Sequence, residues 1–216
     1  MNETKVKHAD PSALGLFGLA IVTLVASSQK LHFTEGTALI LPWSIFLGAI
    51  AQMIAGIYDY KKLNIFGATA FLSYGLFWLG VSMTWLISSG SLGPELQGAM
   101  DVHQLGFAYV GYLVLTIFLT IGAVETNKVL LTIFILIDVL FLGLSLSTFG
   151  IAKNSMHSMA GIAEFLIAIV SLYGAGANVL NNHFGYEFLP IGKPMGIFVK
   201  NNKKNVDKNL SIKYNN

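Results

Sequence analysis

Two acidic side chains and one histidine fall inside long hydrophobic segments, where a charged group is costly. They are Asp138, His157 and Glu164. An acid in such a place is paired, hydrated or protonated. Because carboxyl and imidazole groups can pass protons, these three residues are candidates for a proton path. The alternative is structural: the acids would join neighbouring helices or subunits, and His157 would be an exposed residue at the edge of a loop.

Glu164 belongs to a stripe of small and polar residues on one face of a predicted helix. Its members recur at alternating spacings of four and three: His157, Gly161, Glu164, Ala168, Ser171 and Ala175. Lipid does not favour such a face, so it is expected to contact protein or water. His157 lies seven residues before Glu164, about 10 Å along a helix axis, from where it could pass protons to the acid.

A second set of polar residues interrupts the hydrophobic stretch between Gly48 and Trp78. We predict this stretch to be a helical hairpin that lines a pore. Its predicted pore-lining residues are Gln52, Asn64, Thr69 and Ser73. Small and hydroxylated side chains in a membrane helix indicate a face turned toward protein or water.

Two of these residues have structural alternatives. Gly48, Gln52 and Gly56 share one helical face, so Gln52 either hydrogen-bonds between helices or binds the solute. Asn64 precedes the second helix of the hairpin and is expected to cap its free N–H groups. If the solute passes nearby, those N–H groups also form an anion site.

The composition is that of a membrane protein. Hydrophobic residues make up 54% of the 216 residues and charged residues only 11%, against about 25% charged in soluble domains. There is no cysteine, and the five histidines are scattered, so we expect no disulfide, no metal site and no cofactor. Arginine is absent, which gives nucleic-acid binding no support beyond the lysine-rich C-terminal tail.

Hydrophobic runs predict the fold class: an all-α membrane protein in which six transmembrane helices form a bundle with a central pore. The predicted helices cover residues 14–28, 38–58, 66–87, 105–124, 129–150 and 156–180. The lysines before the first helix resemble part of a cleavable signal peptide. We expect this helix to be retained, because its removal would leave five helices and place the C-terminus on the wrong side.

The lysines predict the orientation. Eleven of the 13 precede the first helix, lie in the second–third and fourth–fifth connections, or follow the sixth helix, whereas Lys30 and Lys153 lie on the other side. The positive-inside rule then places both termini in the cytoplasm. We expect a cytoplasmic N-terminus at residues 1–9, a transmembrane domain at 10–192, and a partly disordered lysine- and asparagine-rich cytoplasmic tail at 193–216.

Three motifs follow one another along the chain. The first is Asp10-Pro11-Ser12-Ala13-Leu14-Gly15-Leu16, which is similar to Asn-Pro-Ala-Pro-Leu-Gly-Leu. The second comprises Gly48, Gln52, Gly56 and the run from Asn64 to Trp78. The third comprises Val179-Leu180-Asn181 and Leu189-Pro190-Ile191-Gly192. Together they resemble the motifs of the acetate uptake transporter family, also called the succinate-acetate or ammonium/acetate permease family.

The resemblance implies a six-helix protomer with its own pore, assembled as a homo-hexamer in the cell membrane and moving acetate, succinate or related small carboxylates with protons. It implies an apolar constriction at Leu19, Tyr74 and Ile137, in place of the family's Phe, Tyr and Leu. Asp10 stands where the family has Asn, at the expected N-cap of the first helix. Glu164 stands where Gly is common.

The expected transport mechanism follows from the lack of positive charge inside the predicted helices. No lysine or arginine lies deep in a predicted helix, so a carboxylate would cross the constriction without a counter-charge. Passage as the neutral acid, or as anion plus proton, is expected, and transport should rise as the external pH falls. The alternatives are a channel for urea, amides or ammonia, a structural or signalling membrane protein, and a membrane enzyme, for which the chain has no metalloprotease or serine-hydrolase motif.

Overall fold

The computed structural model describes residues 8–198, and within this range every regular element is helical. Among the described residues, six helices are long and apolar enough to cross a membrane, which confirms the predicted all-α fold with six membrane-spanning helices. The central pore and the cytoplasmic termini stay predictions. The six spans are α1 (Ser12–Lys30), Leu41–Lys61, α4 (Ile65–Ser88), α6 (Val102–Ala123), α7 (Lys128–Thr148) and α8 (Lys153–Phe184). Residues 1–7 and most of the predicted tail, 199–216, lie outside the described range.

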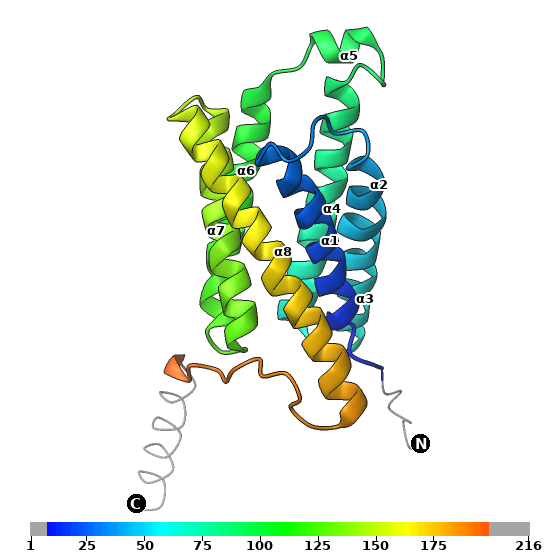
Figure 1. Ribbon diagram of the computed structural model, residues 1–216, viewed down its shortest axis with the longest axis vertical. Coiled ribbons are helices and arrows are strands. Elements are labelled where there is room, and N and C mark those ends of the chain that lie inside the picture. The colour runs from blue at the N-terminus through cyan, green and yellow to red at the C-terminus, as the bar shows by residue number, and fades with distance from the viewer. Residues whose placement is uncertain (1–7, 199–216) are drawn as a thin grey trace, which may run out of the picture.

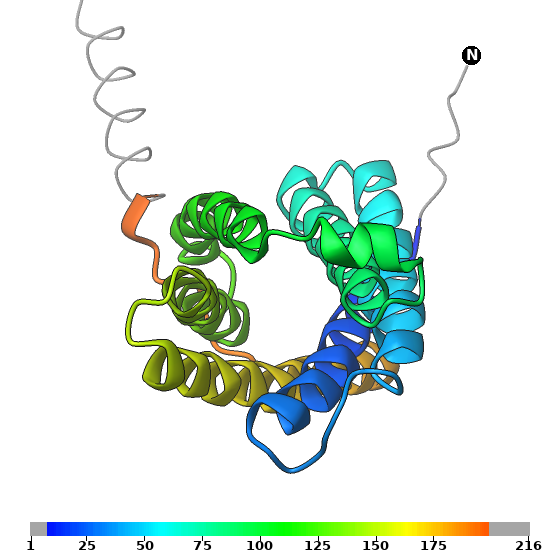
Figure 2. The same cartoon turned by 90° about the horizontal axis from the view of Figure 1, so that it is seen from above.

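The six spans run along the long axis of the molecule (Figure 1) and form a ring when seen from above (Figure 2). α8 packs against both α1 and α7, α7 packs against α6, and the second span packs against α4. The first and last described residues lie at the same end of the bundle (Figure 1). The Asn64 connection lies at this end, so it is called the Asn64 end below.

The second span is a continuous helix of three parts. α2 (Leu41–Trp43) leads into a π-helical segment, η1 (Ser44–Ala51), which leads into α3 (Gln52–Lys61). Gly48 therefore lies in the wider π-helical turn, and the predicted face of Gly48, Gln52 and Gly56 does not follow a regular α-helix. At Gly18 of α1 any side chain would collide with the carbonyl oxygen of Leu47 in η1, so the absence of a side chain allows this close helix contact.

Short polar side chains begin several helices. Asn64 accepts a hydrogen bond from the Gly67 N–H at 3.2 Å and Asn127 accepts one from Leu130 at 2.9 Å, so the expected capping role of Asn64 is confirmed. The expected N-cap position of Asp10 is wrong, because Pro11 occupies it. Asp10 instead accepts a hydrogen bond from the Ser12 N–H at 2.9 Å.

α8 is longer than predicted, with 32 residues from Lys153 to Phe184. At about 1.5 Å per residue, it exceeds the thickness of a bilayer core. It continues past the predicted end at residue 180, and there Asn181 bonds to both backbone groups of Leu189. It stops at Gly185, which has the left-handed conformation that glycine adopts without strain. A short extramembrane helix, α5 (Pro94–Gly98), was not predicted.

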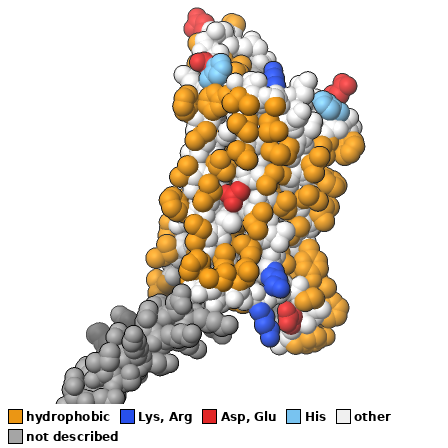
Figure 3. Space-filling model, turned by 90° about the vertical axis from the view of Figure 1, so that its left-hand side faces the viewer, with side chains coloured by type: hydrophobic (Ala, Val, Ile, Leu, Met, Phe, Trp, Pro, Cys, Tyr) orange, Lys and Arg blue, Asp and Glu red, His pale blue; other side chains and the backbone are white. Residues whose placement is uncertain are grey.

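The exterior of the bundle is hydrophobic. Figure 3 shows one side of the molecule covered with apolar side chains, with charged groups toward both ends and an acidic side chain in the middle. Large apolar residues exposed on the membrane helices include Phe46, Ile54, Phe107, Phe118 and Ile135. Such a surface suits lipid or further protein.

Candidate functional site

A cavity of about 330 Å³ opens between the helices at the Asn64 end. Its wall combines apolar side chains with a set of polar ones: Asp10, Ser12, Gln52, Asp59, Asn64, Thr126, Asn127 and Asn178. These residues come from α1, α3, α4, α7, α8 and the segments next to them. Among the residues described, no lysine lines this cavity.

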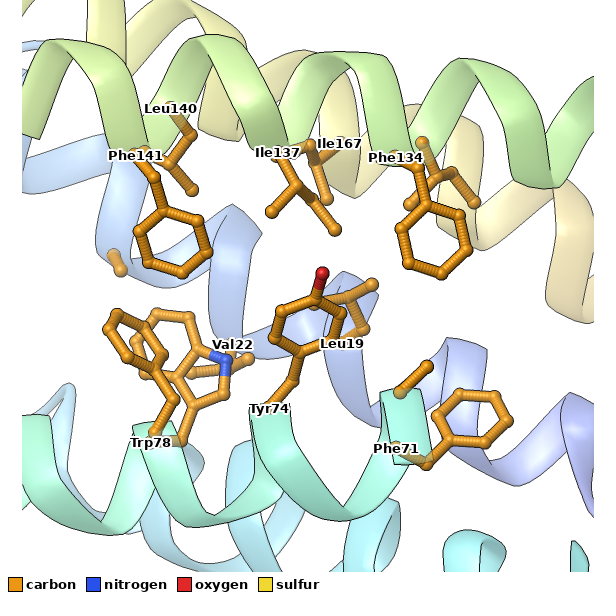
Figure 4. Close-up of a cluster of buried hydrophobic side chains, with 14 of the residues drawn as sticks. Leu19, Val22, Phe71, Tyr74, Trp78, Phe134, Ile137, Leu140, Phe141 and Ile167 are labelled. Carbon is orange, nitrogen blue, oxygen red and sulfur yellow. The ribbon is translucent and has the colours of Figure 1, made fainter. Parts of the chain in front are cut away.

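The cavity reaches the three residues expected to form the constriction. Leu19 on α1, Tyr74 on α4 and Ile137 on α7 all line it, and their exposed fractions are 6%, 4% and 3%. Figure 4 shows Tyr74 pointing toward α7, with Ile137 opposite and Leu19 beside the ring. The structure thus brings these three residues together around a buried apolar contact.

Aromatic rings from α7 border the same contact. Phe134 and Phe141 lie 6.3 and 6.4 Å from the Tyr74 ring centroid, and the Phe141 ring is stacked on it. The constriction that the resemblance implies has Leu19 in place of Phe, and therefore one ring fewer. Phe134 and Phe141, which are not among its three residues, supply rings beside Tyr74.

A hydrogen bond orients the Tyr74 ring. Its hydroxyl lies 2.9 Å from Oγ1 of Thr116 on α6, and Thr116 donates its own proton to the carbonyl of Tyr112 at 2.7 Å. Tyr74 is therefore the donor to Thr116. Both side chains are buried, so this bond holds the ring across the space between α4 and α6.

Gln52 is fully buried in the cavity wall. Its amide nitrogen donates to the carbonyl of Gly48 at 2.7 Å, within its own span rather than to another helix. Its Oε1 is buried and has no hydrogen-bond partner in the structure. One acceptor therefore remains for a ligand, since unpaired buried polar groups are costly.

Asp59 is a cavity residue that our sequence reasoning missed. Its place beside Lys61 and Lys62 indicated a residue at the membrane surface, yet it is only 1% exposed and lines the cavity. Both of its carboxyl oxygens are buried, and neither has a partner in the hydrogen bonds formed within residues 8–198. One signal was available: Asp59 follows Gln52 by seven residues, two helical turns, which places both on one face of α3.

The other two predicted pore-lining residues, Thr69 and Ser73, are partly exposed and do not belong to the cavity wall. The carbonyl of Ser73 accepts a hydrogen bond from the Tyr112 hydroxyl at 3.0 Å. Gln52 and Asn64 are thus brought to the cavity, whereas Thr69 and Ser73 are not.

Glu164 forms an ion pair that was not expected. Nζ of Lys30, the last residue of α1, donates to Oε2 of Glu164 at 2.9 Å, and the two side chains are 12% and 2% exposed. Lys30 ends its helix, so it does not lie deep in a helix, yet its ammonium group reaches the buried carboxyl group of Glu164. The small stripe on α8 explains the contact, because Gly161 lets Lys30 and Leu31 approach closely.

Asp138 accepts a hydrogen bond from the Thr120 hydroxyl at 2.6 Å, which joins α7 to α6. It is half-buried, halfway along α7, and does not line the cavity. His157 lines a separate cavity of about 430 Å³ near the opposite end, together with His32 and Lys153. Within residues 8–198, no hydrogen bond joins Asp138, His157 and Glu164 into a chain.

No group of three His, Cys, Asp or Glu side chains that could hold a metal ion occurs in the part of the chain that the structure describes. In the cavity at the Asn64 end, the buried side-chain atoms without a hydrogen-bond partner among the described residues are acceptors: Oε1 of Gln52 and the two oxygens of Asp59. A ligand with a hydrogen-bond donor satisfies them better than an anion does.

Comparisons with known proteins find a family match and related proteins. Residues 1–194 match the model of the GPR1/FUN34/yaaH family. The chain is 35% identical to the succinate-acetate/proton symporter SatP of Escherichia coli (strain K12) over 194 residues, 89% of this chain and 99% of that protein. It is 28% identical to the ammonia transport outward protein 2 of Saccharomyces cerevisiae, over 83% of this chain and 64% of that one.

A solved structure has the same fold. The structure of the bacterial acetate channel SatP superposes with a TM-score of 0.80 at 34% sequence identity. The match covers 86% of this chain and all of the other.

Proposed function

Because the chain belongs to the GPR1/FUN34/yaaH family, we propose that it moves acetate, succinate or related small carboxylates across a membrane through its own cavity and constriction. The relatives named as symporter, channel and ammonia transporter support a transport role rather than catalysis. The cavity and the buried contact of Leu19, Tyr74 and Ile137 form the solute path in this proposal.

The observation that carries the proposal is the charge and polarity of the cavity. Among the described wall residues there is no lysine, and the unpartnered polar atoms of Gln52 and Asp59 are acceptors. A carboxylate offers only further acceptors, whereas a carboxylic acid brings an O–H donor. The solute therefore crosses as the neutral acid, or as an anion together with a proton, which avoids moving a bare charge through the apolar constriction.

A channel for small neutral solutes is the second candidate. Oε1 of Gln52 can accept an N–H from urea, an amide or ammonia as well as an O–H, and one relative is named as an ammonia transport protein. Counterflow separates the two candidates, since a simple channel shows no stimulation by unlabelled acid on the other side.

We place the protein in the cell membrane with both termini cytoplasmic and with six copies in one assembly. Lysines 61, 62 and 128 lie at the Asn64 end, whereas Lys30 and Lys153 lie toward the other, which supports this orientation. The half-buried Asp138 in the middle of a membrane helix supports contact with other protein rather than lipid alone.

The experiment is a transport assay with purified protein in liposomes. Labelled acetate, succinate and urea are offered separately under an imposed pH gradient, acid outside. The proposal predicts saturable uptake of at least one of the two acids that exceeds urea uptake and is stimulated by unlabelled acid inside. Urea uptake without stimulation of acetate uptake supports the neutral-solute channel instead.

A further inference from the structure

We propose that Asp59 binds the transported proton in the cavity at the Asn64 end and, as the neutral acid, donates a hydrogen bond to the carboxylate group of the solute. This inference rests on the proposed function and adds to it the residue on which the proton is held. Its basis is a buried carboxyl group in the wall of the cavity with no partner for either oxygen.

The charged groups around Asp59 leave it without a counter-ion. Asp10 and Lys62 are the charged residues that act on it. Lys62 is already paired with Asp10, with Nζ 3.3 Å from Oδ2. The other titratable side chain of the cavity wall, Tyr74, is a neutral phenol that forms its hydrogen bond with Thr116. An ionised Asp59 would have no paired charge of its own, and only the nearby Asn64 amide and Lys62 would favour it. A bound proton therefore relieves the cost of its burial.

The missing side chain of Gly67 leaves room for the carboxyl group of Asp59. Any side chain at Gly67 on α4 would collide with Oδ2 of Asp59 and with the Asn64 amide. Gly67 lies in the first turn of α4, close to Asn64, which caps that helix. The positive end of α4 therefore lies beside Asp59 and the cavity, where it favours the negative charge that remains after proton release.

The proton is the occupant that the surroundings favour. A cation site needs several oxygen ligands, and no cluster of three or more possible metal-binding side chains exists in residues 8–198. A solute carboxylate next to an ionised Asp59 would add a second negative charge. One proton shared between the two carboxyl groups removes that repulsion.

The transfer is a simple acid–base step. A carboxylic acid that has passed the constriction loses the proton of its O–H bond, and a new O–H bond forms on Asp59. The solute leaves as the carboxylate, and Asp59 then releases its proton to water. The sequence runs in reverse for efflux, and no electron is transferred.

The test is the pH dependence of acetate binding to the detergent-solubilised protein, measured with ¹³C-acetate by ligand-observed NMR between about pH 5.5 and pH 8. In the wild type, the dissociation constant should rise by about tenfold per pH unit once the shared proton is lost. In Asp59→Asn, the amide always donates, so the dissociation constant should change by less than about twofold over this range. Asp59→Ala should bind acetate weakly at every pH.

Two further variants make the test decisive. Asp101→Asn also changes an acid to an amide, at an exposed helix cap outside the spans, and should keep the wild-type pH dependence. Asp59→Glu should keep the pH slope with a displaced midpoint. A full wild-type slope in Asp59→Asn, or wild-type affinity in Asp59→Ala, would overturn the proposal, and so would loss of the slope in Asp59→Glu.

Acetate exchange by the wild-type protein in liposomes is measured in parallel. Exchange together with a full slope in Asp59→Asn rejects the role of Asp59 and leaves the proposed function standing. A wild-type protein that neither binds nor exchanges acetate rejects the proposed function itself.

Discussion

Lys30 at the end of α1 and Glu164 in α8 are 134 residues apart in the sequence, and their side chains form an ion pair of 2.9 Å inside the bundle. The pair joins the first and last membrane helices where Gly161 allows them to approach. Burial removes both charges from water, so each one depends on the other.

Removing one partner of this pair should destabilise the protein. Lys30→Met and Glu164→Gln each leave an unpaired polar or charged group, and for a buried pair the expected cost is about 3–5 kcal/mol. The double variant Lys30→Met/Glu164→Gln leaves no unpaired charge and should recover most of the loss. Thermal unfolding in detergent measures the stability of each variant. The control is Lys153→Met, which changes an exposed lysine on α8, the helix of Glu164, and should resemble the wild type.

The same variants decide the role of Glu164 in transport. If Glu164 carries protons, the double variant should be stable but should show a weaker dependence of acetate uptake on pH. Wild-type pH dependence in the stable double variant would assign the pair to helix packing.

Tyr74→Phe should loosen the constriction without unfolding it. The change removes the hydrogen bond to Thr116, at an expected cost of about 0.5–1.5 kcal/mol, and leaves the ring free to move. We expect a smaller preference for acetate over larger carboxylates in liposome uptake. Thr116→Val removes the same bond from the other side, so the double variant should add little to either single variant; full additivity would argue against the bond.

The side chain at residue 19 should set the size limit of the solute. Leu19→Phe adds a ring to a contact that is already buried, whereas Leu19→Ala removes bulk. We expect the ratio of succinate to acetate uptake to fall in the first variant and rise in the second, by roughly tenfold between the two. An unchanged ratio in both variants would place the narrow point elsewhere.

Asp10 should stabilise the folded protein at neutral pH but not in acid. Burial by itself raises the pKa of Asp10, but the hydrogen bond from Ser12 and the charge of Lys62 outweigh it and hold the pKa below its ordinary value. A carboxyl group with a lowered pKa in the folded state stabilises it above its unfolded pKa, about 3.9, and this contribution is lost as the pH falls.

Asp10→Asn tests this reasoning. The variant should melt at a lower temperature than the wild type at pH 7, and the difference should shrink below about pH 4. A difference that grows in acid would have the wrong sign for a lowered pKa.

Local patterns predicted much of this structure, because hydrophobic length determines which segments span a membrane. The capping role of Asn64 followed from its position alone. The Lys30–Glu164 pair could not be predicted, since it depends on where α1 crosses α8. Asp59 was missed because the neighbouring lysines indicated the membrane surface, whereas the side chain turns inward on the face that it shares with Gln52.

The most direct test of the central claim is acetate uptake into liposomes that contain only this protein, with the internal pH fixed and the external pH varied from about 8 to about 5. Coupled passage of carboxylate and proton predicts that saturable uptake rises as the external pH falls and that a protonophore abolishes accumulation. Uptake that stays constant across this range, beyond what protein-free liposomes show, would contradict the account.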